Sequence, residues 1–394
     1  MAGQKSGGRK GDWRAATQVI LAGRDPFEQH GFVNTPIYRG STVLSRTVTD
    51  FSGKAGRFVY GRRGTPTTEA LASAITSLEG GAGTTLTSSG LSAITTALMA
   101  VARAGDHVLV ADTVYGPTRH FCDTILSGYG VEIGYFDPLI GGGIRDLFKQ
   151  NTRAVFAESP GSLSFEVQDI PAIAEAAHKR GAALLMDNTW ATPVYFRPHD
   201  FGVDLSIQSG TKYLGGHADA NLGAISATTD YWPKLKETTG TLGLNPGPED
   251  VFLMSRGLRT LAVRLERHME SGLKIAHWLD DRPEVARVLH PALPSHPQHA
   301  IWKRDFKGAS GLFSVVLKPY PQSAVNAFVE SLELFGIGAS WGGYESLAIP
   351  FDCTKVRTAT QWNPGGPTVR LHIGLEDPDD LIEDLENGLS RLAQ

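Results

Sequence analysis

The sequence predicts an α/β protein, with a mostly parallel, doubly wound sheet in a large domain and a smaller α+β domain after it. Three observations support this prediction. The chain has 394 residues, and a single hydrophobic core rarely grows beyond about 250–300 residues. Between residues 63 and 261, short apolar runs alternate with helical patterns, as they do in parallel sheets. After residue 261 this alternation stops, so we expect a second domain there.

In the large domain, residues 63–261, strands and helices are expected to alternate. We expect helices at 67–79, 91–103, 118–126 and 170–179, and strands at 84–87, 107–111, 131–136, 154–157, 182–186 and 205–208. Gly80 and Gly181 are placed to end the first and last of these helices. Ligands bind at the carboxyl ends of the strands in such a sheet, so residues that follow a strand are the candidates for a site.

The two ends of the chain differ from this region. Residues 1–62 are rich in Gly, Thr and Arg with little periodicity, and we expect an arm that wraps over another subunit or domain. The small domain, residues 262–394, is expected to follow a long helix at 261–279. It would hold strands at 311–317 and 369–373, a helix at 323–332 between them, and a final helix at 378–392.

Composition excludes several classes of protein. The formal net charge of -4 argues against a dedicated nucleic-acid binder, and no run approaches the ~20 apolar residues of a membrane span. The only cysteines, Cys122 and Cys353, give neither a disulfide framework nor a zinc spacing, which favours a reducing cytoplasm. The histidines show no metal-ligand spacing, so no metal is expected.

Two residues that follow strands suggest cofactor chemistry. Lys212 lies in Ser-Gly-Thr-Lys-Tyr directly after strand 205–208, where a reachable amine beside hydroxyl groups suits a Schiff base and an anionic phosphate. The alternative is a solvated surface lysine. Asp187 ends the buried strand 182–186, where it needs a cation such as a pyridinium nitrogen, although it could instead cap a helix. A separation of 25 positions (212 − 187) allows one βα crossover, so both residues would emerge at the same sheet edge.

Three further features fit the same site. The Ser88-Ser89-Gly90 turn precedes a helix whose N-terminus could bind a phosphate, although many βα turns look alike. Tyr115 follows strand 107–111 and could stack on a flat ring, or be a half-buried loop residue. Arg370 lies in an alternating strand and could bind a substrate carboxylate in bidentate fashion, or form a surface ion pair.

Taken in order, these features resemble the transsulfuration (Cys/Met metabolism) family of pyridoxal-phosphate (PLP) enzymes, which have the aspartate-aminotransferase fold with a seven-stranded sheet. The resemblance covers residues 35–376. Its markers are Tyr60-Gly61-Arg62, Ser88-Ser89-Gly90, Tyr115-Gly116-Pro117-Thr118, Asp187-Asn188-Thr189-Trp190, Ser209-Gly210-Thr211-Lys212-Tyr213, Arg256-Gly257-Leu258-Arg259-Thr260-Leu261 and Ser340-Trp341-Gly342-Gly343-Tyr344-Glu345-Ser346-Leu347.

Within the family the sequence resembles the β-lyase branch. Trp190 stands where the γ branch typically carries Phe, and Trp341 where it typically carries Leu. The segment Glu158-Ser159-Pro160-Gly161-Ser162 is also similar to the β-lyase version.

The resemblance implies a role for each marker. Lys212 would carry the cofactor and act as the general base, Asp187 would hold the pyridine nitrogen, and Tyr115 would stack on the ring. The phosphate would be bound by Gly90, Leu91, Ser209 and Thr211, and by Tyr60 and Arg62 of a neighbouring subunit. Arg370, with Ser340, Trp341 and Tyr60, would bind the substrate.

The implied reaction is cleavage of the Cβ–S bond of an amino-acid thioether such as L-cystathionine, to homocysteine, pyruvate and ammonia. The implied assembly is a homotetramer made of two dimers with shared sites. The alternatives are a γ-synthase or γ-lyase of the same family and, from another class, a non-catalytic α/β protein that binds a phosphate ligand at 88–90.

Overall fold

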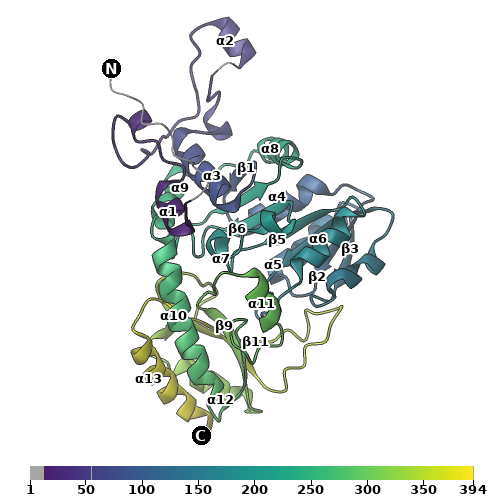
Figure 1. The fold of residues 1–394 in the computed structure, drawn as a ribbon, viewed down its shortest axis with the longest axis vertical. Coiled ribbons are helices and arrows are strands. Elements are labelled where there is room, and N and C mark those ends of the chain that lie inside the picture. Colours follow the sequence, from purple (N-terminus) through teal and green to yellow (C-terminus); the bar gives the residue numbers. More distant parts are fainter. Residues whose placement is uncertain (1–12, 55, 394) are drawn as a thin grey trace.

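The computed structural model describes residues 13–54 and 56–393, and it confirms the predicted two-sheet α/β architecture (Figure 1). The large sheet has seven strands in the order β1-β7-β6-β5-β4-β2-β3. Its strands are β1 (Gly83–Thr87), β2 (His107–Ala111), β3 (Glu132–Phe136), β4 (Thr152–Glu158), β5 (Ala183–Asp187), β6 (Leu205–Ser209) and β7 (Gly223–Ala227). Only β7 runs antiparallel, between β1 and β6, and all six predicted strands of this domain are present.

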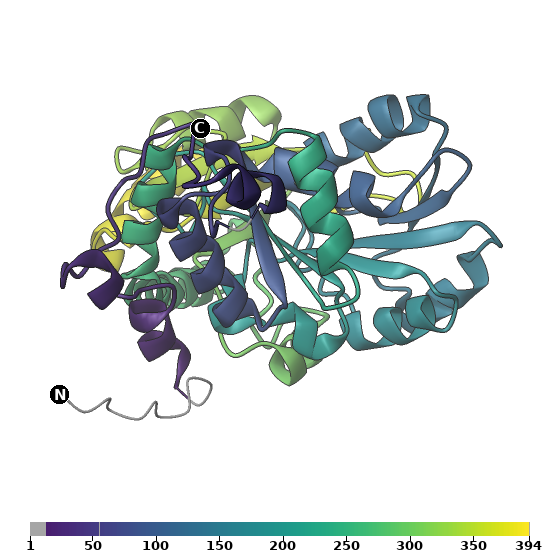
Figure 2. The ribbon, with the colours of Figure 1, turned by 90° about the horizontal axis from the view of Figure 1, so that it is seen from above.

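The large sheet is covered on both faces. Every residue of β2 and β7 is buried, and both Figure 1 and Figure 2 show helices around the sheet. The helices of this part of the chain are α3 (Pro66–Glu79), α4 (Gly90–Val101), α5 (Gly116–Phe121), α6 (Ile170–His178), α7 (Thr192–Tyr195), α8 (Trp232–Thr241) and α9 (Pro248–Leu258). α5 continues through a π-helical turn over Cys122–Leu126, so the helix expected at 118–126 is present but not uniform.

Local sequence explains where α3 begins and ends. Thr65 accepts a hydrogen bond from the Thr68 N–H while the Thr68 side chain bonds back to Thr65, which together form a capping box ahead of Pro66. Gly80 ends the helix at φ +77°, a left-handed conformation that favours glycine.

The small sheet has five strands in the order β10-β11-β12-β9-β8. They are β8 (Val285–Leu289), β9 (Leu312–Leu317), β10 (Phe335–Gly336), β11 (Ser346–Phe351) and β12 (Thr368–His372). The helices here are α10 (Leu261–Asp280), α11 (His299–Asp305), α12 (Gln322–Glu330) and α13 (Pro378–Leu389). α10 runs from the large sheet to the small one (Figure 1). A separate apolar core lies under these elements, although the exact domain boundaries at 62 and 261 stay a prediction.

The N-terminal arm contacts its own chain at several points, although much of it is exposed. The Tyr38 N–H donates to the Thr67 hydroxyl at 2.8 Å, and Arg39 forms an ion pair with Glu249. α1 (Ala15–Leu21) buries Val19, and the Arg259 guanidinium donates to the carbonyls of Val19 and Ala22. Beyond it, apolar side chains face solvent, with Phe27 92%, Leu44 90% and Val48 82% exposed.

In Figure 1 the short helix α2 (Val48–Gly53) lies well away from the body of the molecule. Residues 1–12 of the expected arm lie outside the described residues. Within them, no helix is both long and apolar enough to cross a bilayer.

Candidate active site

Lys212 is reached through the turn that follows β6. Its Nζ donates to Ser340 Oγ at 2.7 Å and lies 5.3 Å from the centre of the Trp341 ring. Burial, and after it the positive charge of Arg370, lower the pKa of Lys212 to about 8 against the opposing effect of Asp187. About a tenth of the amine is therefore neutral at pH 7, far more than for an ordinary lysine, and the neutral form is what a nucleophile or base requires.

Asp187 is the last residue of β5. The N–H and the hydroxyl of Thr189 both donate to its Oδ1, at 3.0 and 2.5 Å. No donor in the described part of the chain lies within hydrogen-bond distance of Oδ2. Burial raises the pKa of Asp187, whereas these hydrogen bonds and Lys212 lower it. A half-buried carboxylate with one oxygen left without a donor fits a ligand that presents a cationic N–H.

Glu158 lies beside Asp187 and was not among the residues assigned a role from the sequence. It ends β4, and the parallel register pairs it directly with Asp187 on β5. Its Oε2 accepts the backbone N–H of Tyr115 at 2.7 Å. Burial raises the pKa of Glu158 well above its usual value, and the neighbouring Asp187 raises it further. Both carboxyl groups thus have raised pKa values, and Glu158 has the neighbouring Asp187 charge as an additional cause.

Tyr115 follows β2 at the start of α5 and is 45% exposed. Burial raises the pKa of its hydroxyl, the carboxyl groups of Glu158 and Asp187 raise it too, and Arg370 lowers it. The hydroxyl thus lies within the electrostatic influence of the groups predicted to share its site. Its stacking on a ring stays a prediction.

Arg370 comes from the small domain. It lies in β12, and its Nη2 donates to the Ser340 carbonyl at 3.0 Å. Burial lowers the pKa of Arg370 to about 10, so it remains charged at neutral pH. Ser340 therefore contacts both cations, Lys212 through its hydroxyl and Arg370 through its carbonyl.

Gly342 allows the Ser340 loop to lie against Lys212. It has φ +84°, and a Cβ atom there would lie 3.0 Å from the Lys212 carbonyl carbon. Its N–H also lies 3.1 Å from Nε2 of the buried His372. A side chain at this position would push the loop away from Lys212.

The expected phosphate end is formed where α4 meets β6. A Cβ atom on Gly90 would lie 2.5 Å from Ser209 Oγ, so only glycine lets the start of α4 approach this strand. Leu91 is in the first turn of the same helix. The Thr211 hydroxyl accepts from the Leu222 N–H at 3.1 Å, so it is already engaged with the backbone. The phosphate-binding roles of these residues stay predictions.

Tyr60 and Arg62 are not brought to this chain's own Lys212. Arg62 donates to the Gly240 carbonyl at 2.9 Å and lies over the Tyr60 ring at 6.0 Å. Arg62 also lines a cavity of about 670 Å³ between the arm, α3 and α8, on which Lys212 does not border. The role of Tyr60 and Arg62 in a neighbouring subunit stays a prediction.

The branch marker Trp190 has a structural place. Its Nε1 donates to the Leu312 carbonyl on β9 at 2.9 Å, and its ring meets Phe306 edge-on. The residue is buried, so it joins the turn after Asp187 to the small domain.

These residues fit PLP: a lysine of lowered pKa, an aspartate with a free oxygen, and a helix N-terminus approached through glycine. Residues 16–390 match the family described as Cys/Met metabolism PLP-dependent enzyme. A putative cystathionine beta-lyase of Rhizobium johnstonii is 53% identical over 95% of both chains. The cystathionine beta-lyase of Salmonella typhimurium is 44% identical over 97% of this chain and 100% of its own.

A solved structure agrees with these sequence matches. The structure of cystathionine gamma synthase from Xanthomonas oryzae pv. oryzae, in complex with aminoacrylate and cysteine, superposes with a TM-score of 0.89. It is 35% identical and covers 97% of this chain and 99% of its own. The predicted fold and cofactor are confirmed, and the chain belongs to the PLP-dependent enzymes of Cys/Met metabolism.

Proposed function

We propose that this chain is a cystathionine β-lyase, which cleaves the Cβ–S bond of L-cystathionine to give homocysteine, pyruvate and ammonia. The observation that carries the proposal is the double contact of Ser340, with the Lys212 amine at 2.7 Å and the Arg370 guanidinium at 3.0 Å. One residue thereby holds a base suited to Cα beside a cation suited to the α-carboxylate. An amino-acid substrate needs both groups in one site.

Each residue then has one task. Arg370 binds the α-carboxylate, which orients the Cα–H bond toward Lys212. Lys212, with its pKa lowered to about 8, accepts the Cα proton, and Ser340 holds its amine in place. Bound PLP supplies an electron sink that stabilises negative charge at Cα. Asp187 balances the charge of the pyridine nitrogen, and Lys212 or Tyr115 donates a proton to the leaving sulfur.

A second candidate reaction acts at Cγ of the substrate and not at Cβ. The Xanthomonas oryzae relative is a γ-synthase, so γ-elimination or γ-replacement is the rival reaction. Two observations favour β-elimination: the relatives of higher identity are named cystathionine beta-lyase, and the Trp341 ring lies against the Lys212 amine. Trp190 carries less weight, since its indole N–H is already engaged with the Leu312 carbonyl on β9.

A product assay with purified protein and L-cystathionine tests the choice. Pyruvate with free homocysteine is the expected result. Release of 2-oxobutyrate with cysteine would instead establish the γ reaction. Lack of both products in a protein that shows the cofactor's visible absorbance would reject cystathionine as the substrate.

We further propose a homotetramer in which two subunits share each site. The support is the exposed apolar arm around Phe27, Leu44 and Val48, together with Arg62 beside an open cavity. Cys122 and Cys353 are both buried free thiols, which favours a reducing compartment such as the cytoplasm.

Mixing two inactive variants tests the shared site. Lys212→Ala and Arg62→Ala proteins are mixed, unfolded together and refolded. A mixed dimer with shared sites contains one wild-type site, so random pairing restores about a quarter of wild-type activity. Unmixed controls of each variant stay inactive. No recovery, despite confirmed exchange of subunits, would mean that Arg62 serves its own chain.

A further inference from the structure

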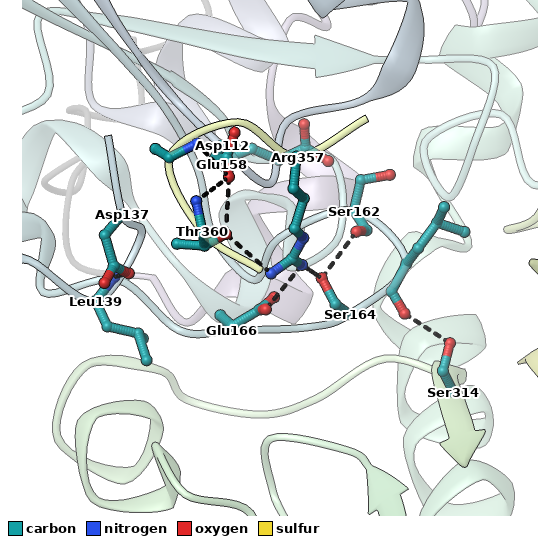
Figure 3. A network of polar contacts seen from close by, with 12 residues as sticks. Asp112, Asp137, Leu139, Glu158, Ser162, Ser164, Glu166, Ser314, Arg357 and Thr360 are labelled. Atoms are coloured by element: carbon teal, nitrogen blue, oxygen red, sulfur yellow. Dashed lines mark hydrogen bonds and ion pairs between the residues drawn. The ribbon is translucent and has the colours of Figure 1, made fainter. Parts of the chain in front are cut away.

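A segment of the small domain crosses to the large domain beside the site. We name residues 353–362, between β11 and β12, the strap. In Figure 1 it belongs to the yellow loop that leaves the small sheet on the right of the view. Figure 3 shows its contacts with Asp112 and with the loop that follows Glu158. None of the roles assigned above uses this segment.

Asp112 is the first anchor of the strap. It follows β2 directly and is 3% exposed. Its carboxylate accepts the successive backbone N–H groups of Thr358, Ala359 and Thr360 at 3.0, 3.1 and 2.8 Å. The Thr360 hydroxyl donates at 2.7 Å, and the Arg119 guanidinium forms an ion pair with the same carboxylate. Three consecutive amides directed at one carboxylate form an anion nest.

The hydrogen bonds from the strap keep the carboxyl group of Asp112 ionised. Burial by itself would raise its pKa, but the hydrogen bonds from Thr358, Thr360 and Ala359 outweigh burial, and the pKa of Asp112 is lowered. The carboxylate therefore binds the strap as an anion at neutral pH.

Arg357 is the second anchor. Its guanidinium forms an ion pair with Glu166 at 2.8 Å, bonds to the Ser164 hydroxyl, and lies 5.0 Å from the centre of the Trp362 ring. Glu166 belongs to the loop that starts at Glu158. This loop is tied to the first anchor as well, because the Ser162 N–H donates to the Thr113 carbonyl at 2.8 Å.

The two anchors thus hold the two segments that carry Tyr115 and Glu158. Asp112 lies three residues before Tyr115, and the Tyr115 N–H is itself bonded to Glu158. On its other side, the strap leads into β12, which carries Arg370. A displaced strap would therefore free the Tyr115 segment from the domain that is expected to hold the substrate carboxylate.

We propose that Asp112 is a positioning residue for Tyr115: by binding the strap, it fixes the turn between β2 and α5 and thus the aromatic ring expected over the cofactor. The inference rests on the proposed function for the identity of the substrate, and on the family assignment alone for the cofactor. It gives Asp112, and through the strap Arg357, a role in positioning Tyr115, although the partners that hold them, such as Thr358 and Glu166, do not include Lys212.

The test compares Asp112→Ala with Asp137→Ala. Asp137 is a matched control, because it also follows a strand, β3, and accepts a turn N–H, that of Leu139 at 2.8 Å, but it is exposed and does not touch the strap (Figure 3). Asp112→Ala is expected to lower kcat/KM for cystathionine by about 10- to 100-fold, since small misplacements at a site cost this much. Asp137→Ala is expected to leave it unchanged.

A spectroscopic readout separates positioning from general damage. Circular dichroism in the visible band of the bound cofactor reports how the ring is held, and we expect Asp112→Ala to reduce it and to weaken cofactor binding. This measurement needs no substrate, so it remains decisive if cystathionine is not cleaved. Asp112→Asn, which keeps the size of the side chain, should show the same changes to a smaller degree, and it replaces Asp112→Ala if that variant does not fold.

A double-mutant cycle decides whether Asp112 acts through Tyr115. In a Tyr115→Ala background, Asp112→Ala should lower kcat/KM by less than about threefold, because the ring it positions is already gone. Full additivity of the two losses, or an unchanged visible dichroism in Asp112→Ala, would overturn the proposal.

Discussion

The two halves of the site are built in different ways. The large-domain half consists of residues at the carboxyl ends of strands, Asp187 on β5, Glu158 on β4 and Lys212 just beyond β6, so the register of one sheet sets their positions. The small-domain half consists of Arg370 within β12 and of Ser340, which lies in a loop. Ser340 bonds to cations from both halves. The half proposed to hold the cofactor is thus fixed by one sheet, whereas the half proposed to bind the substrate depends on contacts with the large-domain half, such as that of Ser340 with Lys212.

Removal of Lys212 should abolish the function of the large-domain half of the site. Lys212→Ala is expected to abolish turnover and the visible absorbance of the lysine-linked cofactor, since no other amine in the described structure lies beside Asp187 and Ser340. An absorbance scan and a pyruvate assay check this prediction. A yellow, active Lys212→Ala protein would contradict it.

Removal of the charge on Asp187 should be nearly as damaging. Asp187→Asn keeps the shape and the bonds from Thr189 but loses the anion opposite the pyridine nitrogen. We expect kcat to fall by about 10²- to 10³-fold, the range for the loss of one preorganised electrostatic contact. The variant should still bind PLP, which a visible spectrum verifies. A loss in kcat below fivefold would show that Oδ2 of Asp187 does not interact with the pyridine nitrogen.

The small-domain half should respond through substrate binding. Arg370→Lys keeps the charge but not the two parallel donors, so kcat/KM should fall by about 10- to 100-fold, equal to about 1.5–3 kcal/mol for a charge-assisted hydrogen bond. Most of the loss should appear in KM, and the visible spectrum should not change. Steady-state kinetics on cystathionine measure both parameters. An effect confined to kcat would mean that Arg370 does not bind the α-carboxylate of the substrate.

Sequence patterns predicted the large-domain half better than the rest. Asp187 and Lys212 follow apolar strands whose ends are visible in the sequence, whereas β7 (Gly223–Ala227) was missed because Gly-Ala-Ile-Ser-Ala has little strand character of its own. Its burial between β1 and β6 makes it a strand. Glu158 ends a strand just as Asp187 does, so the same signal was present in the sequence. The bonds of Asp112 to the strap join residues more than 240 positions apart, and no local pattern predicts them.

The charge of Arg370 in the small domain should influence the pKa of the Lys212 amine in the large domain. Arg370 is the second-largest cause, after burial, of the lowered pKa of Lys212, which stands at about 8. The rate at which cofactor-free protein captures added PLP should rise with pH through a midpoint near 8, because only the neutral amine reacts. Arg370→Ala should move the midpoint upward, and Arg370→Lys, which keeps the charge, should not. Equal midpoints in all three proteins would mean that the charge of Arg370 does not influence the pKa of Lys212.

The smallest effect is expected at Glu158, and it sharpens the contrast with Asp187. The two carboxyl groups are paired in register on neighbouring strands, but burial and the charge of Asp187 raise the pKa of Glu158 well above its usual value. Because a raised pKa favours the protonated form of Glu158, Gln should mimic that form, and its amide oxygen can still accept the Tyr115 N–H. Glu158→Gln should keep kcat/KM within about threefold at neutral pH, unlike Asp187→Asn. Equal losses in the two variants would mean that Glu158 is ionised and shares the task of Asp187.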